Sequence, residues 1–276
     1  MRLTPQHIAA YIDATGDVAC GDFAPPMMAV AMSIQGALPL LKRSDIIGDP
    51  ARLAYMVHAE EQITWFSPLR AGDELSVAAD LLARDQRASG EAIIVATQVK
   101  NQRRERIAQT RSTLLIRNPK PASLRALRAE TTRRVTPPQP TFSMQWQVDP
   151  DQAERYANAS GDHNPVHLDN DAARKVGLKG RILHGMCTMA FAQRTVITKL
   201  CDSDSTRLKS LQARFVKPVF PGDILTCFGW PKEAAGQFGF EVRNQCGLVV
   251  VRDGEAQVQI ESSFEFLRDG NVEIRT

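Results

Sequence analysis

Two long apolar runs stand out in the pattern of hydrophobic and polar positions. Residues 27–41 and 186–200 have the length of buried helices, and the shorter stretches 5–15 and 150–160 predict a further helix ahead of each. Thr4-Pro5 and Asp149-Pro150 each place an N-capping side chain directly before a proline, which favours a helix start.

Strand-like runs follow each long helix, and alternation of apolar and polar residues, as in residues 111–114 and 257–260, is typical of antiparallel strands with one buried face. A long helix followed by such strands predicts an α+β unit whose sheet wraps the helix. The expected strands are residues 56–65, 74–82, 92–101 and 107–116, then 208–216, 224–230, 238–244 and 255–267.

The chain also repeats itself. Tyr-Ile-Asp-Ala-Thr-Gly-Asp at 11–17 matches Tyr-Ala-Asn-Ala-Ser-Gly-Asp at 156–162, and Pro-Leu-Arg-Ala-Gly-Asp-Glu-Leu at 68–75 matches Pro-Val-Phe-Pro-Gly-Asp-Ile-Leu at 218–225, 150 residues further on. Matches in one order at nearly one offset predict two homologous halves. Two such units can join their sheets edge to edge, which removes an exposed edge strand from each. We therefore expect two antiparallel sheets, each wrapped around a central helix, joined into one continuous sheet.

The predicted organisation is a degenerate first half at 1–117, a linker at 118–140 and a catalytic second half at 141–276. The linker contains five prolines and several arginines, which cannot sustain a sheet ladder and suit an exposed connector, with a short helix at 123–131. The basic residues could instead contact a phosphate, but a solvated linker is favoured.

Composition narrows the class of protein. In 276 residues, 43% hydrophobic and 24% charged, the net charge of +3 is too small to indicate a nucleic-acid partner. The five scattered cysteines show no CxxC spacing, so neither a disulfide framework nor a zinc knuckle is expected. The N-terminus shows no secretory signal, and the longest apolar stretch is too interrupted to span a membrane. We expect a cytoplasmic protein with no membrane partner.

The residues that carry chemistry lie in Ser-Gly-Asp-His-Asn-Pro-Val-His-Leu-Asp at 160–169 and in Gly-Arg-Ile-Leu-His-Gly-Met at 180–186. Asp162 and His167 can converge on one water if the turn between them folds back, and Pro165 stiffens that turn. A carboxylate and an imidazole can then divide the proton transfers of a water addition. Gly185 opens an apolar helix, where unpaired N–H groups can hold an oxyanion and a glycine allows close approach.

The pattern Tyr-x3-Ser-Gly-Asp-x-Asn-Pro-x-His at 156–167 closely resembles the signature of MaoC-like, R-specific enoyl-CoA hydratases (hydratase 2). The His-Gly-Met of 184–186 and the Phe-x2-Pro-x2-Pro-Gly-Asp of 215–223 also fit this family. The resemblance implies a hot dog fold, and the internal repeat implies a double hot dog. The motif itself covers roughly thirty residues, and the repeat extends the likeness to nearly the whole chain.

The resemblance implies a carbon–oxygen lyase that adds water to a trans-2-enoyl-CoA and gives the (R)-3-hydroxyacyl-CoA, with no cofactor besides the CoA of the substrate. It implies that Asp162 and His167 are the catalytic pair, that Asn164 orients them or the water, and that the Gly185 N–H belongs to the oxyanion hole. The further residues expected to contact the substrate are Ser160 and His184 beside the pair, and Arg181, Arg214 and Lys217 as candidates for the CoA phosphates.

The first half departs from this pattern. Asp17 is kept, but Val-Ala-Cys-Gly-Asp at 18–22 stands where the second half has His-Asn-Pro-Val-His, and Pro25-Pro26 replaces His-Gly before the helix. We expect this half to have lost the chemistry and to shape the acyl pocket, leaving one active site per chain.

Three groups of residues also have other interpretations. The histidines and acids around Asp162 could bind a metal, but the segment fits a calcium loop only at Asp162 and Asn164, and no His-Glu-x-x-His occurs, so no metal is expected. His163 and His184 could be structural hydrogen bonders. The charges of His-Ala-Glu-Glu at 58–61 are expected to form a solvated face.

Other functions remain open at this point: a dehydratase of a specialised hydroxyacyl-CoA or acyl-carrier thioester, a hot dog acyl-CoA thioesterase, or a non-catalytic acyl-thioester binding subunit. The intact motif of the second half argues against the last two. The sequence leaves acyl-chain length, the choice between CoA and carrier protein, the direction of reaction and the pathway undetermined. Two fused units already imitate a dimer, and a further homodimer is compatible with the sequence.

Overall fold

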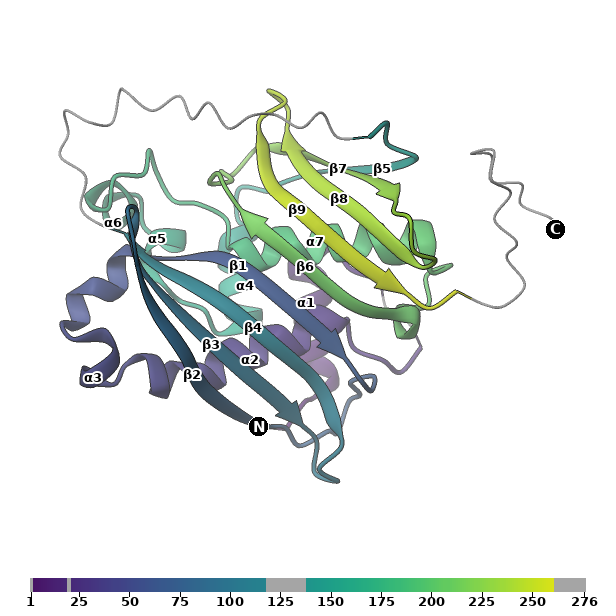
Figure 1. Ribbon diagram of the computed structural model, residues 1–276, viewed down its shortest axis with the longest axis horizontal. Helices are drawn as coiled ribbons and strands as arrows, with labels where there is room; N and C mark the ends of the chain where they lie inside the picture. The colour runs from purple at the N-terminus through teal and green to yellow at the C-terminus, as the bar shows by residue number, and fades with distance from the viewer. Residues whose placement is uncertain (1, 19–20, 118–137, 261–276) are drawn as a thin grey trace.

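The computed structural model describes residues 2–18, 21–117 and 138–260. A single antiparallel sheet of nine strands, in the order β2-β3-β4-β1-β6-β9-β8-β7-β5, runs through both halves of the chain (Figure 1). The expectation of one continuous sheet is therefore confirmed, and β1 and β6 form the join.

The first half contains α1 (Pro5–Thr15), α2 (Pro26–Leu41), α3 (Ser44–Ile47), η1 (Pro50–Tyr55), β1 (Met56–Trp65), β2 (Ser76–Arg87), β3 (Gly90–Lys100) and β4 (Arg106–Arg117). The second half contains β5 (Phe142–Gln147), α4 (Gln152–Ser160), α5 (Pro165–Leu168), α6 (Asn170–Lys175), α7 (Gly185–Leu200), η3 (Ser205–Arg207), β6 (Leu208–Phe215), β7 (Ile224–Pro231), β8 (Gln237–Asn244) and β9 (Val249–Val258).

The helices α1, α2, α4 and α7 all lie behind the same face of the sheet in the view of Figure 1. We call this the inner face. Nearly every residue of the first three turns of α7 is buried, and α2 is buried almost as fully over its first two turns. Both helices contribute to one core cluster that also includes residues of β1, β6 and β9. Burial of each large apolar side chain contributes about 1.5–3 kcal/mol, so these two helices anchor the fold.

The repeat seen in the sequence is present in the hydrogen bonds. Leu3 N–H donates to Asp73 O at 2.8 Å, and Val148 N–H donates to Asp223 O at 2.8 Å, at matching places in the two halves. The pairing of β1 with β6 is symmetric about Gln62 and Gln212. Positions on β1 and β6 therefore correspond at the same offset of 150 residues as the repeated segments 68–75 and 218–225, and a twofold pseudo-symmetry relates the halves.

Several boundaries differ from the expectation. β9 begins at Val249 rather than at residue 255, because Asp253, with φ of 50°, is accommodated inside the strand where its pairing with β6 and β8 shifts register. The helix expected from residue 150 begins at Gln152, and Asp151 stands at its N-cap. The edge strand β5 and the short helices α5 and α6 were not predicted. The linker helix expected at 123–131, most of the predicted linker and residues 261–276 lie outside the described residues, so the domain boundaries remain a prediction.

Among the described residues, no helix has the length and apolar character needed to cross a membrane.

Candidate active site

The turn that follows α4 brings Asp162 and His167 together. Gly161, with φ of 76°, ends α4 in the left-handed conformation that favours glycine. Asp162 Oδ1 accepts a hydrogen bond of 3.1 Å from the Asn164 N–H, and Asn164 caps α5 by accepting 3.3 Å from the Val166 N–H. These two local bonds fold the chain back, so that His167 in α5 faces Asp162.

The side chains of Asp162, His167 and His184 form one cluster. One carboxylate oxygen of Asp162 and one ring nitrogen of each histidine all lie within 4.8 Å of one another. The two imidazoles stack, with centroids 3.7 Å apart and an angle of 27° between their planes. The convergence expected of Asp162 and His167 is thus present in the geometry, and His184 completes the group.

Hydrogen bonds to the backbone set the tautomers of both histidines. His167 Nδ1 lies 2.9 Å from Ile182 O, and a carbonyl only accepts, so Nδ1 carries the hydrogen and Nε2 keeps a lone pair. His184 Nε2 in the same way donates 2.9 Å to Asp162 O. His167 can therefore accept a proton at Nε2, and His184 holds the backbone of Asp162 in place.

Burial sets the charge state of the two rings. It lowers the pKa of His167 below its ordinary value, although the Asp162 carboxylate and the Ile182 carbonyl act in the opposite direction. Burial, together with the neighbouring His167, lowers the pKa of His184 to about 3. Both imidazoles are neutral at pH 7, the state in which His167 can act as a general base.

Gly185 opens α7 beside this cluster. His184 occupies the N-cap position, and among the described residues no side chain caps the helix start by a hydrogen bond. The first N–H groups of α7 are therefore available to an oxyanion, where the helix dipole adds partial positive charge. A Cβ on Gly185 would lie 3.3 Å from Cδ1 of Phe215, so the glycine provides the close approach that a carbonyl needs.

Ser160, which was expected to contact the substrate, forms hydrogen bonds within the turn that leads to Asp162. It is 3% exposed, and its Oγ donates 2.7 Å to Tyr156 O and accepts 3.2 Å from the Asp162 N–H. Ser160 thus helps to hold the turn that carries Asp162.

The three basic candidates differ in how free they are. Arg181 forms an ion pair with Glu154 and donates 2.8 Å to Pro150 O, so its guanidinium is held against the α4 region. Arg214 pairs with Glu60 at 3.1 Å and Asp253 at 3.5 Å. Lys217 is exposed just beyond β6. A role of any of them in binding CoA phosphates remains a prediction.

The matching place in the first half is filled by a side chain that the sequence did not single out. Gln193, on α7, donates 2.6 Å to Asp17 Oδ2 and accepts 2.7 Å from the Met27 N–H in the first turn of α2. Its amide thus occupies the first available N–H of α2, since Pro26 has none, and the aspartate that corresponds to Asp162. Burial raises the pKa of Asp17 to about 6. This arrangement closes the first-half counterpart of the active site.

A small cavity of about 130 Å³ remains next to this closed site. Its wall includes Trp65, whose Nε1 donates 3.0 Å to Pro26 O, and Leu208 at the start of β6. The second half therefore contributes the beginning of β6 to the cavity wall at the start of α2.

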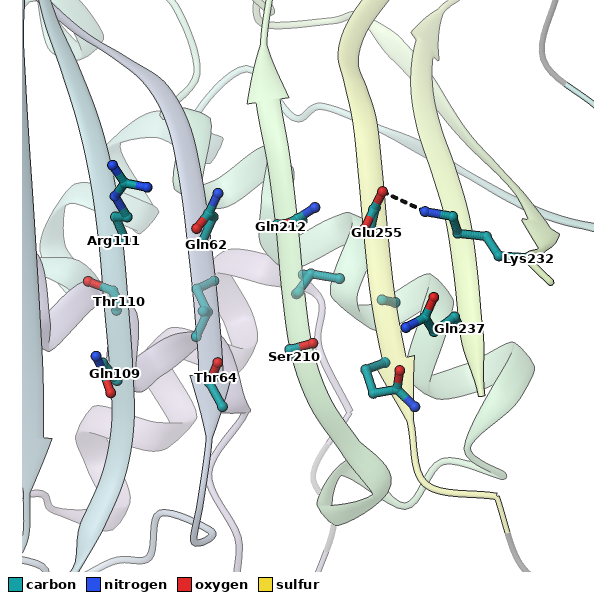
Figure 2. A pocket seen from close by; sticks show the side chains of 14 residues that line it. Gln62, Thr64, Gln109, Thr110, Arg111, Ser210, Gln212, Lys232, Gln237 and Glu255 are labelled. Atoms are coloured by element: carbon teal, nitrogen blue, oxygen red, sulfur yellow. Dashed lines mark hydrogen bonds and ion pairs between the residues drawn. The ribbon is translucent and has the colours of Figure 1, made fainter. Parts of the chain in front are cut away.

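A larger hollow of about 390 Å³ lies on the outer face of the sheet, across the join of β1 and β6 (Figure 2). Its side chains are mostly amides and hydroxyls, such as Gln62, Thr64 and Gln212, with a Lys232–Glu255 ion pair of 2.5 Å at one side. It faces away from α4 and α7, the helices next to Asp162 and Gly185, so it is separate from the candidate active site.

Comparison with known proteins identifies the class of protein that this fold and site define. The MaoC-like domain family matches residues 126–248, and the FAS1-like dehydratase domain region matches residues 9–110. The 3-hydroxyacyl-thioester dehydratase Y of Mycobacterium tuberculosis is 31% identical over 221 residues, which cover 74% of this chain and 73% of that protein. The chain therefore belongs to the MaoC-like dehydratase family.

Two further comparisons concern the fold and the share of a relative that the chain matches. A MaoC-like dehydratase from Phytophthora capsici superposes with a TM-score of 0.76 at 24% identity, covering 95% of this chain and 94% of that one, and this likeness confirms the α+β double hot dog fold. The probable enoyl-CoA hydratase 2 of Dictyostelium discoideum is 37% identical over 109 residues, which are 40% of this chain and 37% of that protein. The chain thus matches well under half the length of that relative.

Proposed function

We propose that the protein is a hydratase/dehydratase that adds water to the double bond of a trans-2-enoyl-CoA and gives the (R)-3-hydroxyacyl-CoA. The single observation that carries this proposal is the cluster of the Asp162 carboxylate and the His167 imidazole beside the uncapped first turn of α7. The names of the relatives, enoyl-CoA hydratase 2 and 3-hydroxyacyl-thioester dehydratase, support the same chemistry.

The reaction follows from the placement of the atoms. A water held between Asp162 and His167 gives a proton to His167 Nε2 while its oxygen bonds to C3 of the enoyl group. The electron pair of the double bond moves onto the thioester oxygen, which the N–H of Gly185 stabilises as an enolate. C2 then takes a proton from the Asp162/His167 pair, so one water is added in total and the pair returns to its starting state.

Asn164 and His184 act as positioning residues in this mechanism. Asn164 caps α5, which carries His167, and His184 fixes the carbonyl of Asp162. Neither needs to exchange a proton with the substrate. We propose that the reaction uses no metal and no cofactor besides the CoA of the substrate, because backbone N–H groups at the start of α7 can hold the enolate and a neutral His167 can take the proton of the water.

The same site would catalyse the reverse dehydration, since an enzyme lowers the barrier equally in both directions. A dehydratase acting on a hydroxyacyl-CoA or an acyl-carrier thioester is therefore the same proposal read backwards. A thioesterase of the same fold would instead release a free thiol. Cytoplasmic location and a homodimer remain predictions from the sequence.

The test is a spectrophotometric assay with crotonyl-CoA and longer trans-2-enoyl-CoAs. We expect absorbance of the conjugated enoyl group to fall on addition of the protein, without release of free thiol. Asp162→Asn and His167→Gln should each lower kcat by about 10²–10⁴-fold while the folded structure is kept. Asp169→Asn is the matched control, because Asp169 caps α6 and asparagine caps equally well. Near-normal turnover by either catalytic variant, or thiol release, would overturn the proposal.

A further inference from the structure

A second imidazole–carboxylate pair lies on β1, where the sequence predicted a solvated face. That prediction is wrong for Glu61, whose side chain is fully buried, and for His58, whose side chain is 14% exposed. His58 Nε2 lies 2.6 Å from Glu61 Oε2. Glu61 Oε1 is also buried, and no hydrogen-bond partner for it exists among the described residues.

A β-bulge explains how two residues three positions apart reach the same face. The pairing of β1 with β4 shifts register between His58 and Glu60, so Ala59 is an extra residue in the strand. Glu60 consequently points away and pairs with Arg214, whereas His58 and Glu61 both face inward. The bulge was not detectable from the sequence pattern, and alternation alone would place these two side chains on opposite faces.

The pair lies next to the candidate active site. The ring of His58 meets the ring of Phe215 edge to face at 5.6 Å, and Phe215 is the side chain that covers Gly185. The pseudo-symmetry gives the same placement independently. Leu208 corresponds to His58, and Leu208 lines the small cavity at the closed first-half site. His58 therefore stands at the corresponding wall of the second-half site.

Glu61 lies further along the floor formed by β1 and β6 than His58 does. Directly opposite it are Ser112 on β4 and Ala213 on β6, and both of these are small, buried residues. In the part of the chain that the structure describes, neither of these small residues donates a hydrogen bond to Glu61 Oε1. An acyl chain that runs inward from a thioester at Gly185 would pass His58 and then Glu61.

A buried carboxylate oxygen without a donor favours a ligand that supplies one, and a wholly apolar chain laid against it would leave it unpaired. We propose that His58 and Glu61 are specificity-determining residues, which select acyl groups that carry a hydrogen-bond donor, such as a hydroxyl, a few carbons beyond the thioester. Glu61 Oε1 accepts from the hydroxyl, and His58 holds Glu61 in place. This inference rests on the proposed function, because it assumes that acyl thioesters bind at Gly185.

The test compares the binding of saturated acyl-CoAs that bear a hydroxyl at C5, C6, C7 or C8 with that of the unsubstituted acyl-CoA of the same length. Dissociation constants are measured by calorimetry, which requires no turnover. We expect the wild-type protein to bind at least one hydroxylated chain about tenfold or more tightly than its apolar match. The double variant His58→Leu/Glu61→Leu should lose or reverse this preference.

The chain itself supplies the design of that variant. Leu208 and Leu211 stand at the two corresponding positions of β6, and they are 2% and 1% exposed, so the fold accommodates this pair of side chains on the inner face. Glu60→Leu is the control, since it removes the same charge from the opposite face of the same strand, and it should keep the preference.

The outcomes separate the two proposals. Acyl-CoA binding without a preference for any hydroxylated chain, or a preference that the double variant retains, overturns the selective role of His58 and Glu61 and leaves the hydratase proposal standing. Absence of all acyl-CoA binding overturns both.

Discussion

Phe215 Cδ1 lies only 3.3 Å from the point that a Cβ on Gly185 would occupy. The ring is part of β6, which forms the join between the halves, and the glycine is the first residue of the helix that holds the proposed oxyanion. Because of this contact, the Phe215 side chain of the sheet leaves little room for a side chain at the first residue of α7.

Gly185→Ala should therefore impair the chemical step more than the fold. The added methyl group must displace either the Phe215 ring or the thioester carbonyl, and a misplacement of about 1 Å can cost on the order of 10²-fold in rate. We expect kcat for crotonyl-CoA to fall by tenfold or more, with thermal unfolding little changed. Phe215→Leu in the same chain gives the methyl group room and should restore part of the lost rate. Equal activity of Gly185→Ala and wild type would show that the first turn of α7 does not hold the carbonyl.

The pH profile should report the lowered pKa of His167. The proposed base is the neutral imidazole, so kcat/KM stays constant above the pKa of the folded protein and falls as the pH drops through it. Burial lowers that pKa below the ordinary 6.5, and activity should persist through this pH and decline only in more acidic solution. The measurement is kcat/KM between about pH 4.5 and 8 in buffers of constant ionic strength. A half-maximal point above 6.5 would contradict the assignment.

Asp17 predicts a different pH dependence, in stability rather than rate. Its pKa is about 6 in the folded protein and 3.8 in the unfolded reference, so the native state binds more protons between these values. Its contribution is greatest below pH 4 and is lost as the pH rises through 6, an effect of about 1–3 kcal/mol. Asp17→Asn should remove this loss, making the variant more stable relative to wild type at pH 8 than at pH 4.

Denaturant titrations at the two pH values measure that difference. Asp22→Asn, at an exposed position, is the matched control and should leave the pH dependence unchanged. If the free energy of unfolding of wild type and Asp17→Asn differs by the same amount at both pH values, the buried carboxyl does not titrate in this range.

Chelation tests the proposal that no metal takes part. Three potential ligand atoms of Asp162, His167 and His184 converge, as they would in a metal centre, so the question is a real one. Dialysis against EDTA followed by assay in metal-free buffer should leave kcat within about twofold of its starting value. Activity that is lost on dialysis and recovered with added Zn²⁺ would show that the cluster binds a metal.

The repeated segments at 11–17 and 156–162 and at 68–75 and 218–225 predicted two homologous halves. Both copies of the first segment end a helix at a left-handed glycine, Gly16 or Gly161. The convergence of Asp162 and His167 was also predictable, since it depends on hydrogen bonds within a few residues, as at Asn164. Turns that depend on hydrogen bonds between residues close in the chain can be predicted from the sequence.

The closure of the first-half site could not be predicted from the sequence. Gln193 is a buried polar residue within a mostly apolar part of α7, and its amide contacts Asp17, which lies 176 positions earlier in the chain. His58 reaches the same face as Glu61 only because of a one-residue bulge at Ala59. The start of β9 was missed because Arg-Asp-Gly at 252–254 has the composition of a turn. Each of these is decided by tertiary pairing, which overrides local propensity.

Equivalent positions on β1 and β6 lie 150 residues apart in one chain, so they can hold different residues. In an assembly of two identical subunits, any residue placed at one end of the central strand pair would appear at the other end too. Joining both units in one polypeptide allows His58 and Glu61 to occupy the positions that Leu208 and Leu211 occupy in the other half, so one end is polar and the other is apolar. Covalent fusion thus allows residues at one end of the β1–β6 pair to change without the same change at the other end.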